Sequence, residues 1–437
     1  MDTRFRRRYN AGFSEALYRR YLADFSRRCG APIDMQIAQT PVFLPAALRA
    51  CAAVAGREIL VQLCDPARIE RMRAAVPSRW KVPNCHGLPT FCVIDFAITR
   101  DARGELVPKL IELQGFPTLI AYETMQHDAW AAALQSVDGL DLEWTSWFSG
   151  LSRAEFLALA QRTILGGHAA ENVVLLDLDP PSQKTYPDFS ATHRLFGIDA
   201  VCPTDLVARG RRLYRTRADG REVRVERIYN RLIADELERK RVALPFDLRD
   251  ELEVEWTPHP DWYWIWSKYS LPFLEHPAVP RARFLSDVRD LPPNLAQRYV
   301  LKPLFSFAGS GVNVAPTAGD VAAIEPSRRH AWCLQEKIDY AAVLEAVDGA
   351  GVKVELRLIY LRPEDDPAFT LAQNLCRLSR GAMMGVDHNK EHTWVGSSIG
   401  IWPAAESAAT AAAVPAPGAT AAPSEGNASS TAAIAPS

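Results

Sequence analysis

The sequence has no CxxC pair, no long apolar run and almost no net charge. Its 437 residues carry a net charge of −2, which gives no argument for a nucleic-acid or membrane partner. No apolar core follows the early arginines, as a secretory signal would require. The eight cysteines are scattered, several within apolar runs, which is typical of reduced, buried thiols and not of a disulfide frame or a zinc site. We therefore expect a cytoplasmic protein.

One stretch has the composition of a phosphate-binding loop without matching a standard motif. It reads YVLKPLFSFAGSGVNV over residues 299–314 and is neither a Walker A loop nor a G-x-G-x-x-G fingerprint. An apolar strand ends at Lys302-Pro303 and is followed by serines and glycines. Backbone N–H groups near a lysine are a common way to hold phosphate. On its own, the stretch also fits a flexible hairpin loop with a surface lysine.

Changes in composition and hydrophobic pattern divide the chain into five regions of a mixed α/β protein. The last region is too poor in apolar residues to form a core, so it is expected to be disordered. The expected regions are a mainly helical segment (1–90), a strand hairpin and helix (91–160), a βαβ region (161–245), a region that contains the lysine and glycine loop (246–402) and an Ala/Pro/Ser tail (403–437).

The βαβ region begins with a near-continuous apolar run over residues 172–179, typical of a parallel strand buried on both faces. A polar, helical stretch follows, and then a second strand at 198–202. Residues 212–231 predict a hairpin that leads into an arginine-rich strand ending at Arg231.

Two carboxylates are expected to face each other in the stretch FCVIDFAITRDARGELVPKLIELQGFPTL, residues 91–119. Two apolar strands flank a turn with glycine near its apex. If the turn is centred between Arg103 and Gly104, Asp95 lies directly opposite Glu112, and Gln114 shares their face. A slipped register would instead put one of the acids on the other face.

Opposed carboxylates repel each other and are costly to desolvate, so removing one is expected to cost no stability. A divalent cation bound between the two carboxylates would neutralise their repulsion. Asp, Glu and the Gln carbonyl are hard oxygen ligands of the kind that Mg²⁺ takes beside nucleotide phosphates. Asp95, Glu112 and Gln114 are therefore the expected metal ligands.

The order of these features resembles the circularly permuted ATP-grasp enzymes, in particular the glutathionylspermidine synthetase-like group. That order is an Asp-Phe strand, a hairpin, Glu-x-Gln, and much later Lys-Pro with a glycine loop. The resemblance implies a permuted ATP-grasp-type fold with a Rossmann-like βαβ region before the nucleotide-binding part. It also implies that Asp95 and Glu112 hold magnesium, with Gln114 where the family has Asn. Ser306 stands where the family has glycine.

A second segment, residues 330–338, resembles the ATP-grasp strand and hinge that hold adenine, with Lys337 as a second phosphate lysine. Asn230-Arg231 resembles the Tyr-Arg-Arg element of permuted members, and the resemblance extends over about residues 90–400. The nucleotide-binding residues that it implies are Lys302, Ser306, Gly309, Ser310, Gly311, Gln335, Glu336, Lys337 and Ile338.

Two strands near the end of the ordered chain carry further candidates. Glu355 and Asn374 lie where an unpermuted ATP-grasp protein would place its metal ligands, and they are rivals to the hairpin acids. Arg357 and Arg377 suit phosphate or carboxylate clamping, because a guanidinium group matches both geometrically. A salt-bridged sheet face would explain the same residues.

The resemblance implies an ATP- and Mg-dependent ligase that joins a small or peptide-like carboxylate to an amine through an acyl phosphate. Arg231, Arg357 and Arg377 would be the catalytic residues. A nucleotide-binding protein of the same fold without ligase activity is the main alternative. It is favoured by Gln114, Ser306 and Val93, where the synthetases have an arginine. A third interpretation is an unrelated α/β scaffold whose βαβ unit binds a different small molecule.

Overall fold

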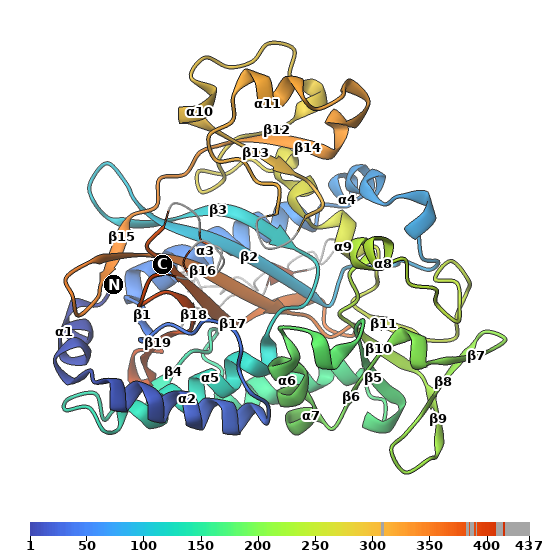
Figure 1. Ribbon diagram of the computed structural model, residues 1–437, viewed down its shortest axis with the longest axis horizontal. Coiled ribbons are helices and arrows are strands. Elements are labelled where there is room, and N and C mark those ends of the chain that lie inside the picture. Colours follow the sequence, from blue (N-terminus) through green and yellow to red (C-terminus); the bar gives the residue numbers. More distant parts are fainter. Residues whose placement is uncertain (307–309, 382–383, 385–388, 390, 408–413, 416–437) are drawn as a thin grey trace, which may run out of the picture.

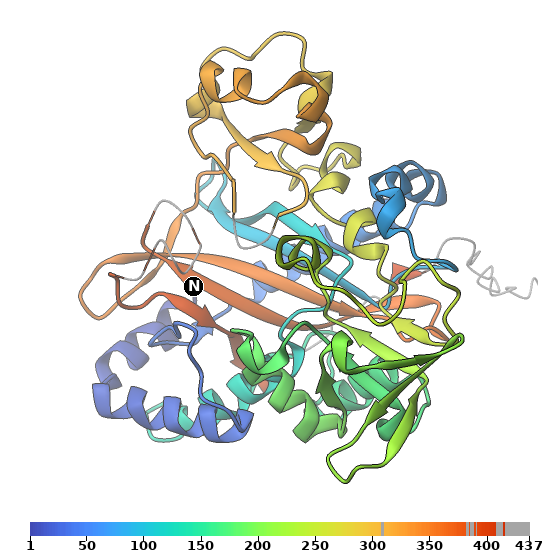
Figure 2. The ribbon, with the colours of Figure 1, turned by 45° about the vertical axis from the view of Figure 1, so that its right-hand side comes forward.

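The computed structural model describes residues 1–306, 310–381, 384, 389, 391–407 and 414–415. A central antiparallel sheet crosses the molecule, with a parallel sheet beside it and a small sheet above it (Figures 1 and 2). The protein is thus a mixed α/β fold, as the sequence predicts.

The central sheet joins segments that are far apart in the sequence. Strand β16 pairs with β17 on one side and with β2 on the other, all antiparallel. The early hairpin and the late strands therefore belong to one sheet. In spatial order, its strands are β18 (Gly396–Ser398), β17 (Ala368–Ser379), β16 (Gly351–Leu361), β2 (Phe91–Arg100) and β3 (Leu106–Gln114), with β15 (Ala342–Glu345) beside β16 and β20 (Val414–Pro415) beside β17.

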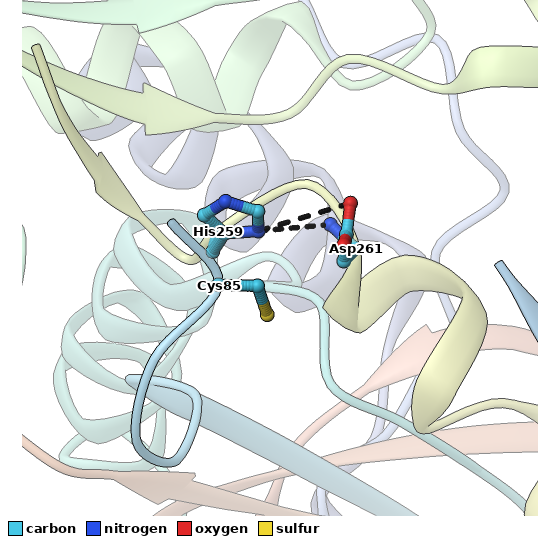
Figure 3. Close-up of side chains that lie close together, drawn as sticks. All are labelled: Cys85, His259 and Asp261. Carbon is cyan, nitrogen blue, oxygen red and sulfur yellow. Dashed lines mark hydrogen bonds and ion pairs between the residues drawn. The ribbon is translucent and has the colours of Figure 1, made fainter. Parts of the chain in front are cut away.

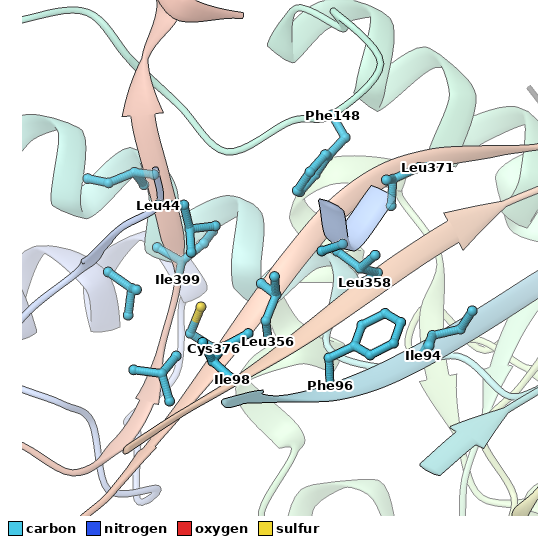
Figure 4. Packing of buried hydrophobic residues seen from close by; sticks show 14 of the residues in the cluster. Leu44, Ile94, Phe96, Ile98, Phe148, Leu356, Leu358, Leu371, Cys376 and Ile399 are labelled. Atoms are coloured by element: carbon cyan, nitrogen blue, oxygen red, sulfur yellow. The ribbon is translucent and has the colours of Figure 1, made fainter. Parts of the chain in front are cut away.

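One face of this sheet is apolar, because side chains alternate between the faces along each strand. Figure 4 shows Ile94 and Phe96 of β2 beside Leu356 and Leu358 of β16. Helix α3 (Ala46–Leu63) packs on this face, and at Gly56 it comes so close that an added Cβ would lie 2.3 Å from the Tyr360 hydroxyl. Asp95 of β2 and the charged residues of β16 consequently lie on the opposite face.

Helices predominate in the first ninety residues, as predicted. Helix α2 packs on α5, where the Tyr21 and Trp130 rings stack with centroids 3.7 Å apart. Among the described residues, none of the helices is both long and apolar enough to cross a bilayer. The further helices of this region are α1 (Thr3–Gly12), α2 (Glu15–Cys29) and α4 (Pro66–Met72), and α5 comprises Ile120–Leu134. A small sheet joins β1 (Val42–Phe43) to two later strands, β19 (Gly400–Pro403) and β4 (Trp144–Thr145).

The predicted βαβ unit is present: β5 and β6 are parallel neighbours joined through α7. The order β11-β10-β5-β6 places the residues that follow β5 and β10 at the same edge of the sheet. The predicted hairpin is also present. The elements are α6 (Arg153–Leu165), β5 (Val173–Leu176), α7 (Tyr186–Phe196), β6 (Asp199–Val201), β7 (Val207–Arg209), β8 (Arg212–Thr216), β9 (Glu222–Val225), β10 (Arg227–Asn230), α8 (Ala234–Lys240) and β11 (Glu255–Thr257).

The small sheet lies above β3 in both ribbon views (Figures 1 and 2). Its strands are antiparallel in the order β12-β14-β13. It contains the strand predicted at 299–301 and carries the candidate lysine. Its elements, with the helix that precedes them, are α9 (Trp262–Ile265), β12 (Ala282–Phe284), α10 (Leu295–Arg298), β13 (Tyr299–Pro303), α11 (Ala318–Ala322) and β14 (Trp332–Glu336).

The expected tail starts later than predicted from composition. Pro403 still belongs to β19, and a short 3₁₀ helix follows over Ala404–Glu406. Glu406 forms an ion pair with Arg4, at 3.2 Å, which holds this turn against α1. Val414 and Pro415 pair with β17. The other tail residues lie outside the described part of the chain.

The close approach at Gly56 yields the first prediction. Gly56→Val should lower the free energy of unfolding by about 1–3 kcal/mol, because its branched side chain overpacks the contact with Tyr360. Gly319→Val, in α11, is the matched control: the nearest atom to an added Cβ is 3.5 Å away. Its effect should stay within about 0.5 kcal/mol in urea denaturation. Equal effects of the two substitutions would contradict the packing described here.

Candidate active site

The two hairpin acids pair as predicted, but for a different reason. Asp95 is the register partner of Glu112, whereas Phe96 pairs with Leu110, so Ile111 is an extra residue in β3. This bulge turns Glu112 onto the face of Asp95. The turn itself is centred half a residue earlier than assumed, since Arg100 pairs with Leu106. Without the bulge, Glu112 would lie on the apolar face.

Asp95 is buried between two arginines and only 1% exposed. Its carboxylate accepts N–H groups from Arg357 Nε and Nη2, each at 2.6 Å, and from Arg377 Nη2 at 2.6 Å. The expectation that an opposed carboxylate could be removed without cost is therefore wrong, because these guanidinium groups compensate its charge. Asp95 as a metal ligand stays a prediction, and binding there would require the arginines to turn away.

Glu112 is the more accessible acid of the pair, with its side chain 26% exposed. Lys268 Nζ lies 3.3 Å from its carboxylate. Burial would raise the pKa of Glu112, but the charge of Lys268, followed by that of Arg377, outweighs burial and lowers it. Gln114, two residues further along β3, donates from its amide nitrogen to the Phe116 carbonyl at 3.0 Å. Its amide oxygen is the atom that could bind a metal.

The rival metal pair is not brought together. Glu355 lies opposite Arg377 in the β16–β17 ladder, pairs with it, and accepts a hydrogen bond from the Tyr340 hydroxyl at 3.2 Å. Asn374 lies opposite Leu358, on the other face. Its amide donates to the Ser146 and Gly400 carbonyls, each at 3.0 Å. Asn374 is therefore a structural amide in this arrangement.

Lys302 connects the small sheet to the bulge. It is 7% exposed, and its Nζ donates to the Ile111 carbonyl at 3.1 Å and to Gln335 Oε1 at 2.6 Å. Burial lowers the pKa of Lys302, an effect that Glu112 opposes. The bulge leaves the Ile111 carbonyl for this lysine, so the strand that carries Lys302 is held to the strand that carries Glu112.

Phe305 and Ser306, which follow β13, lie beside Glu112. Phe305 packs on Trp264, with ring centroids 4.9 Å apart, and the Ser306 carbonyl accepts a hydrogen bond from Lys268 Nζ at 2.5 Å. A cavity of about 30 Å³ lies between this loop and β3, lined among others by Glu112 and Gln114. That volume holds about one water molecule, so a nucleotide requires the loop to move.

The remaining loop positions are described in part. Gly309 lies outside the described residues. Ser310 is exposed, and Gly311 has a φ of 72°, a left-handed conformation that favours glycine. The loop returns to the sheet where Asn313 pairs with Leu301.

The predicted adenine segment follows β14. Gln335 is buried and faces Lys302, whereas Glu336 accepts a backbone N–H from Arg281 at 3.2 Å. Lys337 is exposed, and its backbone N–H donates to the Arg298 carbonyl at 2.8 Å. Ile338 is half-buried. Gln335 thus contacts Lys302, whereas the Lys337 side chain is exposed.

Arg231 joins the site from the parallel sheet. Its guanidinium group donates to buried Asp188 at 2.6 Å and to the Thr118 carbonyl at 3.4 Å. Arg357 donates to the hydroxyl of the same threonine at 2.8 Å. Thr118 therefore lies between two of the predicted catalytic arginines, and Asp95 links Arg357 to the third, Arg377.

Asp177 lies directly after β5, at the edge where Arg231 follows β10. Its carboxylate accepts the backbone N–H of Leu178 at 2.8 Å. Burial raises the pKa of Asp177 to about 7, although the charge of Arg231 acts in the opposite direction. This carboxyl can change protonation near neutral pH.

Sequence reasoning missed Lys268, Thr118 and Asp188. Lys268 is a single lysine in the aromatic stretch DWYWIWSKYS, residues 261–270, and its isolation there is the signal that could have identified it. Asp188 lies within a polar helical pattern and gives no such signal. Thr118 follows a proline just after β3.

The pairing at Asp95 leads to a stability prediction. Asp95→Asn should lower the free energy of unfolding by about 3–5 kcal/mol, because Arg357 and Arg377 then lose a buried counter-charge. In an Arg357→Met background the same change should cost less by about 1 kcal/mol or more, since one stranded cation is already gone. Urea denaturation of the four proteins measures this coupling. Strictly additive effects would show that the pair does not interact.

Asp177 yields a pH prediction. Its folded pKa of about 7 exceeds the ordinary value of 3.8, so the protonated carboxyl is the stabilised form. This contribution is present below about pH 4 and is lost as the pH rises through 7. Wild type should therefore become less stable than Asp177→Asn over that interval, as measured by urea denaturation across pH. Exposed Asp205→Asn is the control, and a pH-independent difference at Asp177 would contradict the assignment.

Comparisons with known proteins show a fold and no closer relationship. No protein-family model matches the chain, and no curated protein matches it. Among solved structures, it is similar to a glutathione synthetase-like effector from Globodera pallida, solved in the apo form. The TM-score is 0.51 at 13% identity, and the match covers 84% of this chain and 94% of that chain. At this identity, the likeness shows a glutathione synthetase-like fold.

Proposed function

We propose that the protein is an ATP- and Mg-dependent ligase of ATP-grasp type, which joins a carboxylate to an amine through an acyl phosphate. The observation that carries this proposal is the charge balance of the site. Three carboxylates, Asp95, Glu112 and Glu355, lie among four cationic side chains. The cations are Arg357, Arg377, Lys268 and Lys302. When all are ionised, the surplus positive charge favours an anionic ligand such as a polyphosphate.

The donor set at β3 fits magnesium. Glu112 and Gln114 lie two residues apart on one strand, line the same small cavity and offer a carboxylate and an amide oxygen. Glu112 carries its negative charge at neutral pH, because Lys268 and Arg377 offset its burial and lower its pKa. Magnesium held there would neutralise charge on the phosphates of ATP during transfer.

Lys302 and Lys268 would hold the phosphates. Both side chains are buried and lie near Glu112. Lys268 now donates to the Ser306 carbonyl and Lys302 to Gln335. Phosphate oxygens would replace these neutral acceptors and form stronger, charge-assisted hydrogen bonds. Opening of the loop at Phe305 and Ser306 would release Lys268 and make room for the nucleotide, with residues 335–338 beside the base.

The arginines would hold the acid substrate. A carboxylate oxygen of the substrate attacks the γ-phosphorus of ATP, ADP leaves, and an acyl phosphate forms. The amine nitrogen then attacks the acyl carbon, phosphate leaves, and the nitrogen loses a proton. Arg357 supplies a guanidinium group on the face of Asp95, near Val93, where the synthetase-like group has an arginine. Arg231, beyond Thr118, would anchor the other end of the substrate.

A nucleotide-binding protein without ligase activity is the second candidate. The observation that favours it is Val93, which is fully buried and pairs with Gln114 in the hairpin. An apolar side chain there cannot stabilise an acyl phosphate directly. Such a protein would have the same nucleotide site as the proposed ligase but would not form an acyl phosphate.

Nucleotide binding is tested at Lys302. Mg-ATP should raise the melting temperature of the wild type, and Lys302→Met should weaken the affinity by about tenfold or more. This is the loss expected for one charge-assisted hydrogen bond worth about 1.5–3 kcal/mol. Lys109→Met, a lysine of β3 that donates to the Pro277 carbonyl, is the matched control. Unchanged affinity in the Lys302 variant, measured by calorimetry, would remove the basis of the proposal.

The ligase step is tested with hydroxylamine, which attacks an acyl phosphate to give a hydroxamate. Wild-type protein with Mg-ATP and a panel of amino acids and short peptides should release ADP and phosphate and form a hydroxamate with one of these acids. Binding of Mg-ATP without a hydroxamate for any acid would favour the second candidate.

A further inference from the structure

Three side chains of metal-binding type meet away from the candidate active site. Cys85 precedes β2, and His259 and Asp261 precede α9 (Figure 3). Across the described residues, they form a group whose ligand atoms (thiol, imidazole and carboxylate) all lie within 4.8 Å of one another. Cys85 is far in the sequence from His259 and Asp261, so no spacing motif indicates that the three residues form a group.

The hydrogen bonds of His259 prepare one ring nitrogen for coordination. Its Nε2 lies 2.9 Å from the Pro83 carbonyl, which can only accept, so Nε2 carries the proton. Nδ1 is then the unprotonated nitrogen; it accepts the backbone N–H of Asp261 at 3.3 Å and lies 3.9 Å from the Asp261 carboxylate, and a metal would replace this long hydrogen bond. A backbone carbonyl that holds the second ring nitrogen in this way is the usual support of a metal-binding histidine. Burial lowers the pKa of His259 to about 4, so the ring is neutral.

Asp261 and Cys85 supply the other two donors. Asp261 Oδ1, which lies 3.9 Å from the His259 ring nitrogen, accepts the backbone N–H of Val82 at 3.0 Å, and this fixes the carboxylate. The Cys85 carbonyl accepts an N–H from Arg73 at 3.3 Å. A thiolate and a carboxylate together balance the charge of a divalent cation.

The site has access to solvent on one side. His259 lines a cavity of about 710 Å³, together with Asn84 and His86. Such a cavity admits water, or the imidazole of His86, as a fourth ligand. One sulfur, one nitrogen and one oxygen donor suit zinc or cobalt and not magnesium, which prefers oxygen alone.

We propose that Cys85, His259 and Asp261 bind one zinc-type divalent ion, with a fourth position open to the cavity. The ion would hold the segment before β2 against the start of α9. The chain continues from α9 to Trp266, whose carbonyl accepts the Gly115 N–H at 2.8 Å, and then to Lys268 beside Glu112. The metal would thus stiffen the support of Lys268 from a distance.

Cobalt is the direct probe, because a thiolate-bound Co²⁺ has a near-ultraviolet charge-transfer band that oxygen ligands do not give. The full chain is titrated with Co²⁺ in excess Mg²⁺, which occupies the all-oxygen sites. We expect one equivalent to bind with this band and Zn²⁺ to displace it. Cys85→Ser should abolish the band, and Asp261→Asn should weaken binding by about tenfold or more, because loss of even an outer-shell partner typically costs about tenfold to a hundredfold. Asn keeps an acceptor for the Val82 N–H, so this variant should stay folded.

Cys51→Ser, at an exposed cysteine of α3, is the control and should bind Co²⁺ as the wild type does. Circular dichroism checks that each variant is folded. The proposal is overturned if the wild type shows no charge-transfer band at one equivalent. It is also overturned if folded Cys85→Ser retains the band, or if folded Asp261→Asn binds as tightly as the wild type. Each result is independent of ATP binding.

Discussion

A carboxylate buried between two guanidinium groups sets the arrangement of the candidate site. Asp95 is 1% exposed, and its two oxygens bind Arg357 and Arg377, which come from two other strands of the central sheet. A buried charge is tolerated only when it is paired in this way, and each partner is then costly to remove. Arg377 extends the network to Glu355, and Arg357 extends it to Thr118. The face on which phosphate chemistry is proposed is therefore a connected set of charges.

The bulge at Ile111 joins this network to the small sheet. It turns Glu112 toward Asp95, and it leaves the Ile111 carbonyl to accept from Lys302. The same lysine is held by Gln335 of β14. Movement of the small sheet consequently changes the surroundings of Lys302, while Glu112 stays fixed in the central sheet. A nucleotide that displaces Ser306 would exchange these internal contacts for phosphate contacts, and this would couple movement of the small sheet to ATP binding.

Local patterns predicted the elements well, and long-range contacts limited the prediction of the site. The apolar runs and the turn fixed the hairpin, the βαβ unit and the strand that carries Lys302, because these depend on neighbours in the sequence. The pairing of Asp95 with Glu112 was also predicted, but the bulge that produces it was not, since a single extra residue leaves no mark in the pattern. The arginines around Asp95 come from strands more than two hundred and fifty residues away (262 and 282). Lys268 and the Cys85 group depend on similar distant contacts, which no spacing in one sequence reveals.

The most direct test of the account is a crystal structure of the protein grown with Mg²⁺ and a non-hydrolysable ATP analogue. We expect a triphosphate between β13 and β3, with oxygens within hydrogen-bond distance of Lys302 Nζ and Lys268 Nζ. We also expect a magnesium ion on Glu112 and Gln114, and displacement of Phe305 and Ser306 from the positions described here. A nucleotide bound elsewhere, or magnesium held away from Glu112 while the loop stays closed, would contradict this expectation.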